Sequence, residues 1–200
     1  MTDVTVPLQT AGSVEIQTLA LISSSGQFIN LTDYMAEINF FEDMFSPFMG
    51  GTITIVDSRN LLKELPIVGD EYIVAKIKTP TVNAFISKMF RVFPVTDREI
   101  IRDLNTQTYN LHFISKEAVL DSLKPLYKSF GGKISDVAQK IFDDYLSNFR
   151  TVTAIKDSLE INPEKSRLVV FPETQNDVKF VSPGWTPFKC INWLATKKGK

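Results

Sequence analysis

The chain has 200 residues, of which 44% are hydrophobic and 11% aromatic, enough to bury a sizeable core in one or two domains. Its 22 basic and 23 acidic residues leave a formal net charge of −1, so no global basic field exists to hold nucleic acid through counterion release. This composition argues against a disordered chain and against DNA binding as the main function.

The N-terminal sequence has no basic start followed by an apolar run, and no stretch of the chain approaches about 18 uninterrupted apolar residues. We therefore expect a soluble protein without a cleaved secretion signal. The single cysteine, Cys190, cannot form an internal disulfide, which fits assembly in a reducing cytosol.

Apolar and polar residues alternate over residues 1–115 in short segments separated by turn residues, which is typical of β-strands. The first two segments predict a hairpin, and in the last one Tyr109, Leu111 and Phe113 share one face. This pattern predicts an antiparallel, tube-like β-barrel or sandwich as the N-terminal domain. The predicted strands are Val14–Ile22, Phe28–Leu31, Ala36–Phe41, Thr52–Val56, Glu71–Lys78, Ser87–Val95 and Thr106–Ile114.

Three connections in this domain have distinct compositions. Gly50–Gly51 is interpreted as the turn between the third and fourth strands, and the charged segment Thr96–Asn105 as a loop before the last strand. Asn60–Leu65 is long enough for one or two helical turns, whose first free amides can donate to Asp57 or Ser58. The domain is therefore expected to carry one short helix.

From Ser115 onward the spacing of apolar residues changes towards the 3.6-residue period of a helix. Ser115 is predicted to cap a helix that runs to about Leu123. The strongest helical pattern follows Gly131–Gly132, which is interpreted as a turn. This helix carries one apolar stripe formed by Ile134, Val137, Ala138, Ile141, Phe142, Tyr145 and Phe149.

The remaining segment mixes strand and helix patterns. Thr151–Ile161 and Arg167–Phe171 are predicted as a strand pair, and Val178–Val181 as a further short strand. Thr186–Pro187 has the N-cap and first-position proline of a final helix. Residues 116–200 are therefore predicted as a smaller mixed α/β domain, and the fold class of the chain as α+β.

Candidate catalytic or metal-binding groups are few. His112, the only histidine, has no second ligand or nucleophile at a diagnostic spacing, and Cys190 has no CxxC partner, so both are interpreted as structural. Adjacent carboxylates point to opposite faces of a strand or lie about 100° apart on a helix, so they form no general acid–base pair by themselves. We therefore assign no catalytic, cofactor-binding or metal-binding residue, and we expect no enzyme activity. The carboxylate pairs are Glu42–Asp43, Asp70–Glu71 and Asp143–Asp144.

A short segment between the third and fourth strands is rich in large apolar side chains. Such a loop either folds back as a cap on the core or contacts a partner, and the residues alone leave both interpretations open. The candidate interface residues are Phe45, Pro47, Phe48 and Met49.

The order and spacing of several motifs together resemble the central baseplate hub proteins of contractile-tailed bacteriophages. The resemblance extends more remotely to the hub part of type VI secretion spike proteins. None of the motifs is catalytic, and they cover most of the chain at the level of pattern. They are EDMFSP at 42–47, GTITIVDS at 51–58, LPIVGDE at 65–71, QTYNLHFISKEA at 107–118, GKISDV at 132–137 and PFKCINWLA at 187–195.

The resemblance implies a structural virion protein of the viral tail, located in the baseplate and assembled in the host cytoplasm. Such hubs are homotrimeric rings that join the tail tube to the central spike and leave a conduit through which DNA passes during viral genome ejection. The implied partners are further copies of the chain, tail tube subunits, the spike and surrounding baseplate proteins, with no small-molecule substrate and no cofactor. The resemblance also favours a contact with a neighbouring subunit for the segment around Phe45.

Hub proteins of this type carry two tube-like barrels, whereas one is evident in this sequence. A second barrel would be expected after the Pro187 helix, so the chain is interpreted as the N-terminal part of a longer hub or as a ring built differently. The alternative functions are another tube-like tail or baseplate protein, or a tail-associated cell-wall hydrolase.

Overall fold

The computed structural model describes residues 15–23, 26–65, 67–78, 85–101, 106–147, 166–170 and 174–196. By their contacts, these residues form two compact units. The first contains 15–42 and 49–114, and the second contains 43–48, 115–147, 166–170 and 174–196. The fold is α+β: a curled antiparallel sheet with one short helix, and a smaller part with helices and a two-stranded sheet.

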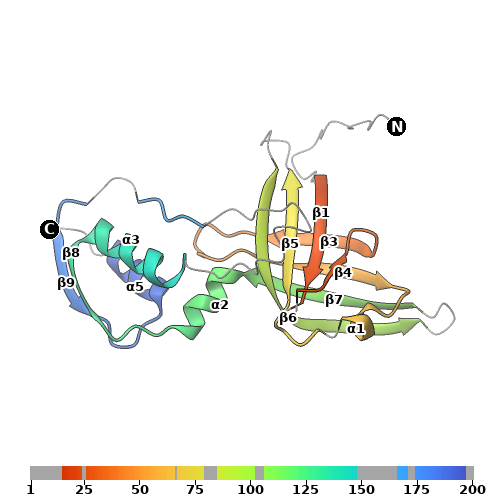
Figure 1. Cartoon of the computed structure of the whole chain (residues 1–200). Coiled ribbons are helices and arrows are strands. Elements are labelled where there is room, and N and C mark those ends of the chain that lie inside the picture. Colours follow the sequence, from red (N-terminus) through yellow and green to blue (C-terminus); the bar gives the residue numbers. More distant parts are fainter. Residues whose placement is uncertain are drawn as a thin grey trace. The chain divides into compact units, whose positions relative to one another are not determined.

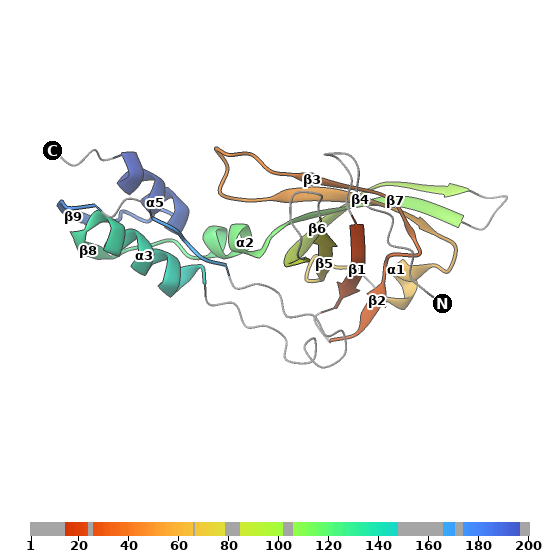
Figure 2. The ribbon, with the colours of Figure 1, turned by 90° about the horizontal axis from the view of Figure 1, so that it is seen from above.

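The first unit is built on a seven-stranded sheet with the order β2-β1-β5-β6-β7-β4-β3. β1 pairs antiparallel with β2 and β5, β4 with β3 and β7, and β5 with β6. The β1–β2 pair confirms the predicted hairpin. Figure 1 shows β1, β5 and the first part of β6 running together, while Figure 2 shows β3, β4 and β7 side by side. The strands are β1 (Glu15–Ile22), β2 (Phe28–Asn30), β3 (Met35–Phe41), β4 (Gly50–Asp57), β5 (Tyr72–Lys78), β6 (Ile86–Ile101) and β7 (Thr106–Ser115).

The two edge strands of this sheet, β2 and β3, are joined by the tight turn Leu31–Tyr34. The Leu31 amide donates to the Leu19 carbonyl on β1 (2.8 Å), and the Val56 amide on β4 donates to the Tyr34 carbonyl (2.8 Å). A connection this short cannot span more than roughly 18 Å, so the opposite edges of the sheet lie close together. The sheet therefore curls into a half-barrel.

Side chains on the concave face of the sheet form the core of this unit. Tyr109, Leu111 and Phe113 are at most 2% exposed, as the alternation in β7 predicts, and Ile53 and Ile55 on the paired β4 are fully buried. The complete buried cluster is Leu19, Leu21, Leu31, Ile53, Ile55, Leu61, Leu65, Ile73, Ala75, Phe90, Val92, Tyr109, Leu111 and Phe113.

The prediction of a turn at Gly50–Gly51 is wrong, because both residues belong to β4 and pair with Phe41 and Phe40 of β3. The connection between the two strands is instead residues 42–49. A Cβ atom on Gly51 would lie 2.1 Å from the Asn39 carbonyl oxygen and 2.3 Å from the Phe113 ring. This glycine therefore serves close packing inside a strand.

The prediction of a loop at Thr96–Asn105 is also wrong in its first part, because β6 continues as far as Ile101, and residues 102–105 lie outside the described residues. Asp97 has a positive φ of 53°, and the side chains of Thr96 and Asp97 both reach β7, at His112 and Asn110. Two consecutive side chains on one face indicate a β-bulge. The charged residues that suggested a loop lie on the exposed part of the strand, where polarity does not oppose strand pairing.

The predicted short helix is α1 (Leu61–Glu64), and Asp57 anchors its start. The Asp57 carboxylate accepts hydrogen bonds from the amides of Leu61 (2.7 Å) and Arg59 (3.0 Å) and from the Gln107 side-chain amide (2.8 Å). Asp57 is only 1% exposed, so these hydrogen bonds compensate for the hydration that the carboxylate loses on burial.

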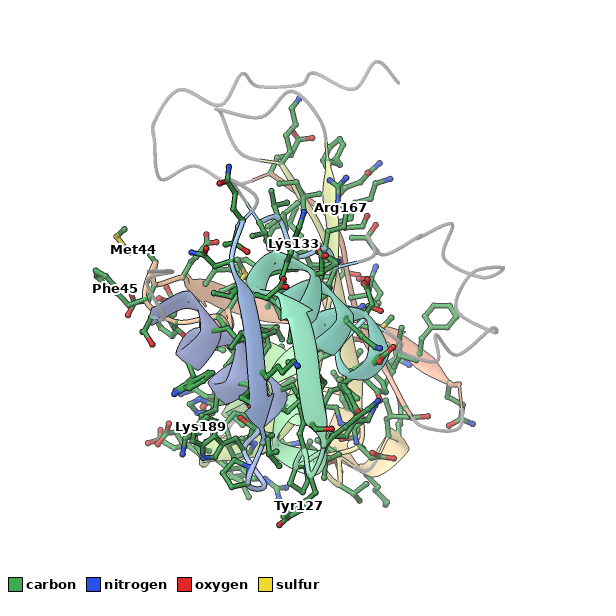
Figure 3. The ribbon with its side chains drawn as sticks, turned by 90° about the vertical axis from the view of Figure 1, so that its left-hand side faces the viewer. Met44, Phe45, Tyr127, Lys133, Arg167 and Lys189 are labelled. Carbon is green, nitrogen blue, oxygen red and sulfur yellow. The ribbon has the colours of Figure 1, made fainter. Side chains whose placement is uncertain are left out.

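The second unit packs helices against a two-stranded antiparallel sheet of β8 (Ser129–Lys133) and β9 (Asp177–Val181). Figure 3 shows the two strands side by side, with α3 (Ile134–Tyr145) and α5 (Pro187–Thr196) behind them. The buried residues of this core are Leu126, Phe130, Ile134, Val137, Ala138, Ile141, Cys190 and Leu194.

Most of the helix predictions in this unit are confirmed. α3 buries its predicted apolar stripe from Ile134 to Phe142, Tyr145 is partly buried, and Phe149 lies outside the described residues. The Lys189 amide donates to Thr186 Oγ1 (3.4 Å), as expected for a cap of α5. α2 (Lys116–Leu123) begins after Ser115, but the Ser115 hydroxyl does not cap it and is buried without a hydrogen-bond partner in the described part of the chain.

The strand predictions in this unit have mixed outcomes. Gly131–Gly132 forms part of β8 and is not a turn, and its pairing partner β9 confirms the strand predicted at Val178–Val181. Thr151–Ile161 lies outside the described residues, and residues 166–170 contain no strand, contrary to the prediction for Arg167–Phe171. Across the described ranges, no helix is long and apolar enough to cross a membrane.

Candidate functional site: an exposed apolar tip

The connection between β3 and β4 is held by hydrogen bonds within itself. The Phe45 amide donates to Asp43 Oδ1 (2.9 Å), and the Ser46 amide donates to the Asp43 carbonyl (3.0 Å). The Ser46 hydroxyl accepts from the Phe48 amide (3.3 Å) and lies 3.2 Å from the Phe48 carbonyl. An Asx turn of this kind gives a short loop a defined conformation without a core beneath it.

This turn directs two adjacent large apolar side chains into solvent. Met44 is 89% exposed and Phe45 is 87% exposed, and Figure 3 shows both pointing away from the ribbon. We call Met44 and Phe45 the apolar tip. Single exposed apolar residues are common on protein surfaces, but an adjacent pair on a conformationally fixed turn is typical of a contact surface.

The four predicted interface residues divide into two groups. Phe45 and Pro47 are exposed, whereas Phe48 and Met49 are partly buried. The Phe48 ring meets Phe188 of α5 edge-on, with 4.7 Å between ring centroids, inside the second unit. Met49 packs against the core of the first unit. Phe48 and Met49 therefore anchor the turn, and Met44, which the sequence analysis did not select, joins Phe45 at its exposed end.

His112 belongs to a chain of polar side chains on the outer face of the sheet. Its Nε2 lies 2.8 Å from the Thr96 hydroxyl, which donates to Asp97 Oδ2 (2.9 Å), so Nε2 carries the proton and donates to Thr96. The Asn110 side chain donates to the same Asp97 oxygen (2.9 Å) and accepts from Thr54 (2.8 Å). The hydrogen bonds from Asn110 and Thr96 lower the pKa of Asp97. The carboxylate therefore orients Thr96 and Asn110, and it makes no direct bond to the imidazole.

The other candidate groups are occupied by structural contacts. Cys190 is fully buried beside the Ser182 hydroxyl (3.2 Å), and burial raises the pKa of its thiol, which disfavours the reactive thiolate. Glu71 is 1% exposed and accepts hydrogen bonds from three backbone amides, while its neighbour Asp70 pairs with Arg91. Among the residues that the structure describes, no cluster of three or more His, Cys, Asp or Glu side chains is arranged to hold a metal ion.

Comparisons with known proteins give remote likenesses of fold. A scan against protein-family models found no match, and a search of curated proteins found none either. Among solved structures, the chain is similar to a tail protein from Neisseria meningitidis MC58, with a TM-score of 0.49 and 11% identity over 89% of this chain and 44% of that one. It is also similar to a chain of the Francisella PdpA–VgrG complex, with a TM-score of 0.40 and 15% identity over 66% of this chain and 22% of that one.

This chain thus spans less than half the length of either similar chain. Identities and TM-scores this low do not transfer a function, so a functional proposal has to rest on the residues of this chain itself.

Proposed function

We propose that this chain is a non-enzymatic structural subunit of a contractile phage tail baseplate, where copies of it form the central hub ring between the tail tube and the spike. The observation that carries the proposal is the apolar tip, Met44 and Phe45, on a turn fixed by its own hydrogen bonds. The motifs that resemble hub proteins, from residue 42 to residue 195, support the same role.

The tip has the energetics of an assembly contact. Burying a Met or Phe side chain at an interface is worth roughly 1.5–3 kcal/mol, so the pair contributes roughly 3–6 kcal/mol per contact. The bonds from Asp43 and Ser46 already order the turn, which lowers the entropy lost on association. In a ring of cyclic symmetry every copy repeats the same contact, so the tip contributes once per subunit.

The proposal that the chain catalyses no reaction rests on how its candidate groups are used. His112 is hydrogen-bonded to a hydroxyl with no carboxylate orienting it, and Cys190 is buried next to Ser182. Neither arrangement activates a nucleophile, because the His112 Nε2 donates to the Thr96 hydroxyl and does not accept its proton, and the Cys190 thiol is buried. The proposed partners are further copies of this chain, tail tube subunits, the spike and neighbouring baseplate proteins, with DNA passing only through the conduit.

The test is the size of the purified protein before and after disruption of the tip. Light scattering after gel filtration and negative-stain electron microscopy should show rings for the unaltered chain. The double variant Met44→Asp with Phe45→Asp should be monomeric with an unchanged circular dichroism spectrum. The matched control is Leu123→Asp, which alters a side chain that is 69% exposed elsewhere and should assemble normally. Rings of the original size from the tip variant would refute the proposed contact. A monomeric unaltered chain with hydrolytic activity would favour the alternative function, a tail-associated cell-wall hydrolase.

A further inference from the structure

The two-stranded sheet of the second unit has an outer face that is separate from the apolar tip. Side chains along β8 and β9 alternate between two faces, so that Phe130 and Phe180 pack into the core and the residues between them are exposed. Figure 3 shows the exposed face towards the viewer, with Lys133 near one end and Tyr127 near the other, while the apolar tip projects to one side. The outer β8–β9 face consists of Ser129, Gly131, Lys133, Asp177, Lys179 and Val181, with Tyr127 at its end.

One end of this face offers apolar surface that is already held in place. Tyr127 is 79% exposed and Val181 is 71% exposed. The Tyr127 side chain rests on Gly184, where an added Cβ would lie 2.8 Å from its Cε1, Cζ and Oη atoms, and the Gly184 amide donates to the Leu126 carbonyl (2.9 Å). Ser129 stands opposite Val181 and is small, which leaves room for a large apolar side chain beside Tyr127 and Val181. Surfaces that are ordered before they meet lose less entropy on association.

The charge around the outer β8–β9 face is opposite to the charge beside the apolar tip. Glu42 and Asp43, which precede the tip, are both exposed acids. Three exposed lysines and one aspartate belong to the two strands and the residue before β8, which leaves a net charge of +2: Lys128, Lys133 and Lys179 against Asp177. None of these acids and lysines forms a salt bridge with another described residue. Acids on one surface and a basic excess on the other orient the approach of two chains.

We propose that the apolar tip of one copy docks on the outer β8–β9 face of the next copy, against Tyr127 and Val181, with its acids towards the lysines. This inference rests on the proposed ring and names the surface that receives the tip. Because the tip points away from this face in its own chain, the contact joins two copies. It is heterologous, since each copy contributes two different surfaces, and such a contact closes into a ring when its rotation is a whole fraction of a turn. A tip that met the tip of its partner would give only a two-fold dimer and would bring Glu42 and Asp43 of both copies together, which like charges oppose.

Disulfide cross-linking tests which two surfaces meet. Cys190 is the only cysteine and is fully buried, so an added surface cysteine is the reactive one. On mild oxidation, Met44→Cys chains mixed with Val181→Cys chains should give a linked dimer, and a chain that carries both substitutions should give a ladder of linked species that ends at the closed ring. The matched control mixes Met44→Cys with Leu123→Cys, a position on α2 that is 69% exposed, and should give no linked dimer.

Two charged substitutions separate this inference from the function on which it rests. Phe45→Asp removes the tip and Tyr127→Asp removes the receiving surface, at positions that are 87% and 79% exposed, and each variant should lose its rings with an unchanged circular dichroism spectrum. Loss of rings in Phe45→Asp with normal rings in Tyr127→Asp would overturn the outer β8–β9 face and leave the tip contact standing. Normal rings in Phe45→Asp would overturn the tip contact itself. Met44→Cys chains that link to one another, and not to Val181→Cys chains, would overturn the head-to-tail arrangement.

A charge reversal provides a second measurement that alters no apolar residue. Lys179→Glu should weaken association roughly two- to fivefold at low salt, as expected for an exposed ion pair, and the difference should shrink at high salt. The matched control is Lys140→Glu, which makes the same change of net charge at an exposed position on α3 and should leave association unchanged. Equal weakening by both variants would show that only net charge matters, and the proposed place of the tip beside Lys179 would be wrong.

Discussion

Replacing Gly51 by alanine should destabilise the first unit, although alanine adds only a methyl group. The added Cβ would lie 2.1 Å from the Asn39 carbonyl oxygen and 2.3 and 2.8 Å from two atoms of the Phe113 ring. Neither neighbour can move freely. The Asn39 carbonyl belongs to β3, and the Phe113 ring packs against Phe40 and Phe90 with centroid separations of 5.5 and 4.8 Å.

The expected magnitude follows from two opposing effects. Overpacking a closed core costs roughly 1–3 kcal/mol, and occasionally more. Alanine recovers about 0.4–1 kcal/mol by restricting the unfolded chain. The midpoints of the two ranges give a net loss of about 1.3 kcal/mol, with an upper limit of about 2.6. Each kcal/mol lowers the melting temperature of a domain of this size by roughly 4–8 °C.

Thermal and urea unfolding of Gly51→Ala measure this loss, and two other glycines serve as controls. A Cβ on Gly50 would lie 3.3 Å from the Phe113 carbonyl oxygen, so Gly50→Ala should have a smaller effect. A Cβ on Gly131 would meet nothing closer than 3.7 Å, so Gly131→Ala should be nearly neutral. Equal stabilities for Gly51→Ala and Gly131→Ala would refute the packing of the Phe113 ring over Gly51.

Three further predictions concern the helix, the thiol and the histidine. Ile134→Asp should lower stability by several kcal/mol, because Ile134 is 8% exposed and the new charge would be buried. The control Asp144→Ala, at an exposed position, should change stability by no more than roughly 0.5 kcal/mol. Equal melting temperatures for the two variants would contradict the assigned face of α3. Because burial raises the pKa of Cys190, unfolding favours its ionised form, so stability should fall as pH rises above the ordinary thiol pKa of about 8.5. Urea unfolding at neutral and alkaline pH should show a smaller fall in Cys190→Ala, and an identical slope in both proteins would contradict the thiol as the cause. His112→Ala should assemble into rings normally, since its hydrogen bond to Thr96 is on the partly exposed outer face; a loss of ring formation in light scattering, or of a measurable hydrolysis by the folded protein, would reverse that assignment.

Local periodicity was sufficient to place much of the fold. The alternation in β7 predicted that Tyr109, Leu111 and Phe113 point inward, and the stripe from Ile134 to Phe142 predicted the buried face of α3. Both predictions hold because the spacing of side chains along a strand or helix is fixed by backbone geometry, independently of the partner that covers them. The hydrogen bond that anchors α1 was also predictable from local sequence, since Asp57 lies four residues before Leu61, whose amide donates to its carboxylate.

Pairing between distant segments decided what the local pattern left open. Gly50–Gly51 and Gly131–Gly132 have the composition of turns, but partners elsewhere in the chain, Phe113 and β9, make both of them parts of strands. β8 could not be recognised from SFGGK, because a segment with one large apolar residue has no alternation to detect.

The candidate site depended both on local sequence and on tertiary structure. The sequence by itself determined that a turn rich in aromatic residues lies between two strands, since Asp43 and Ser46 supply its hydrogen bonds locally. Only the tertiary structure decided that Phe48 packs against Phe188 while Met44 and Phe45 stay in solvent. The physical reason is that hydrophobicity gives each of these side chains the same tendency to be buried, and only the three-dimensional position of a neighbouring surface determines which of them finds a partner within the chain.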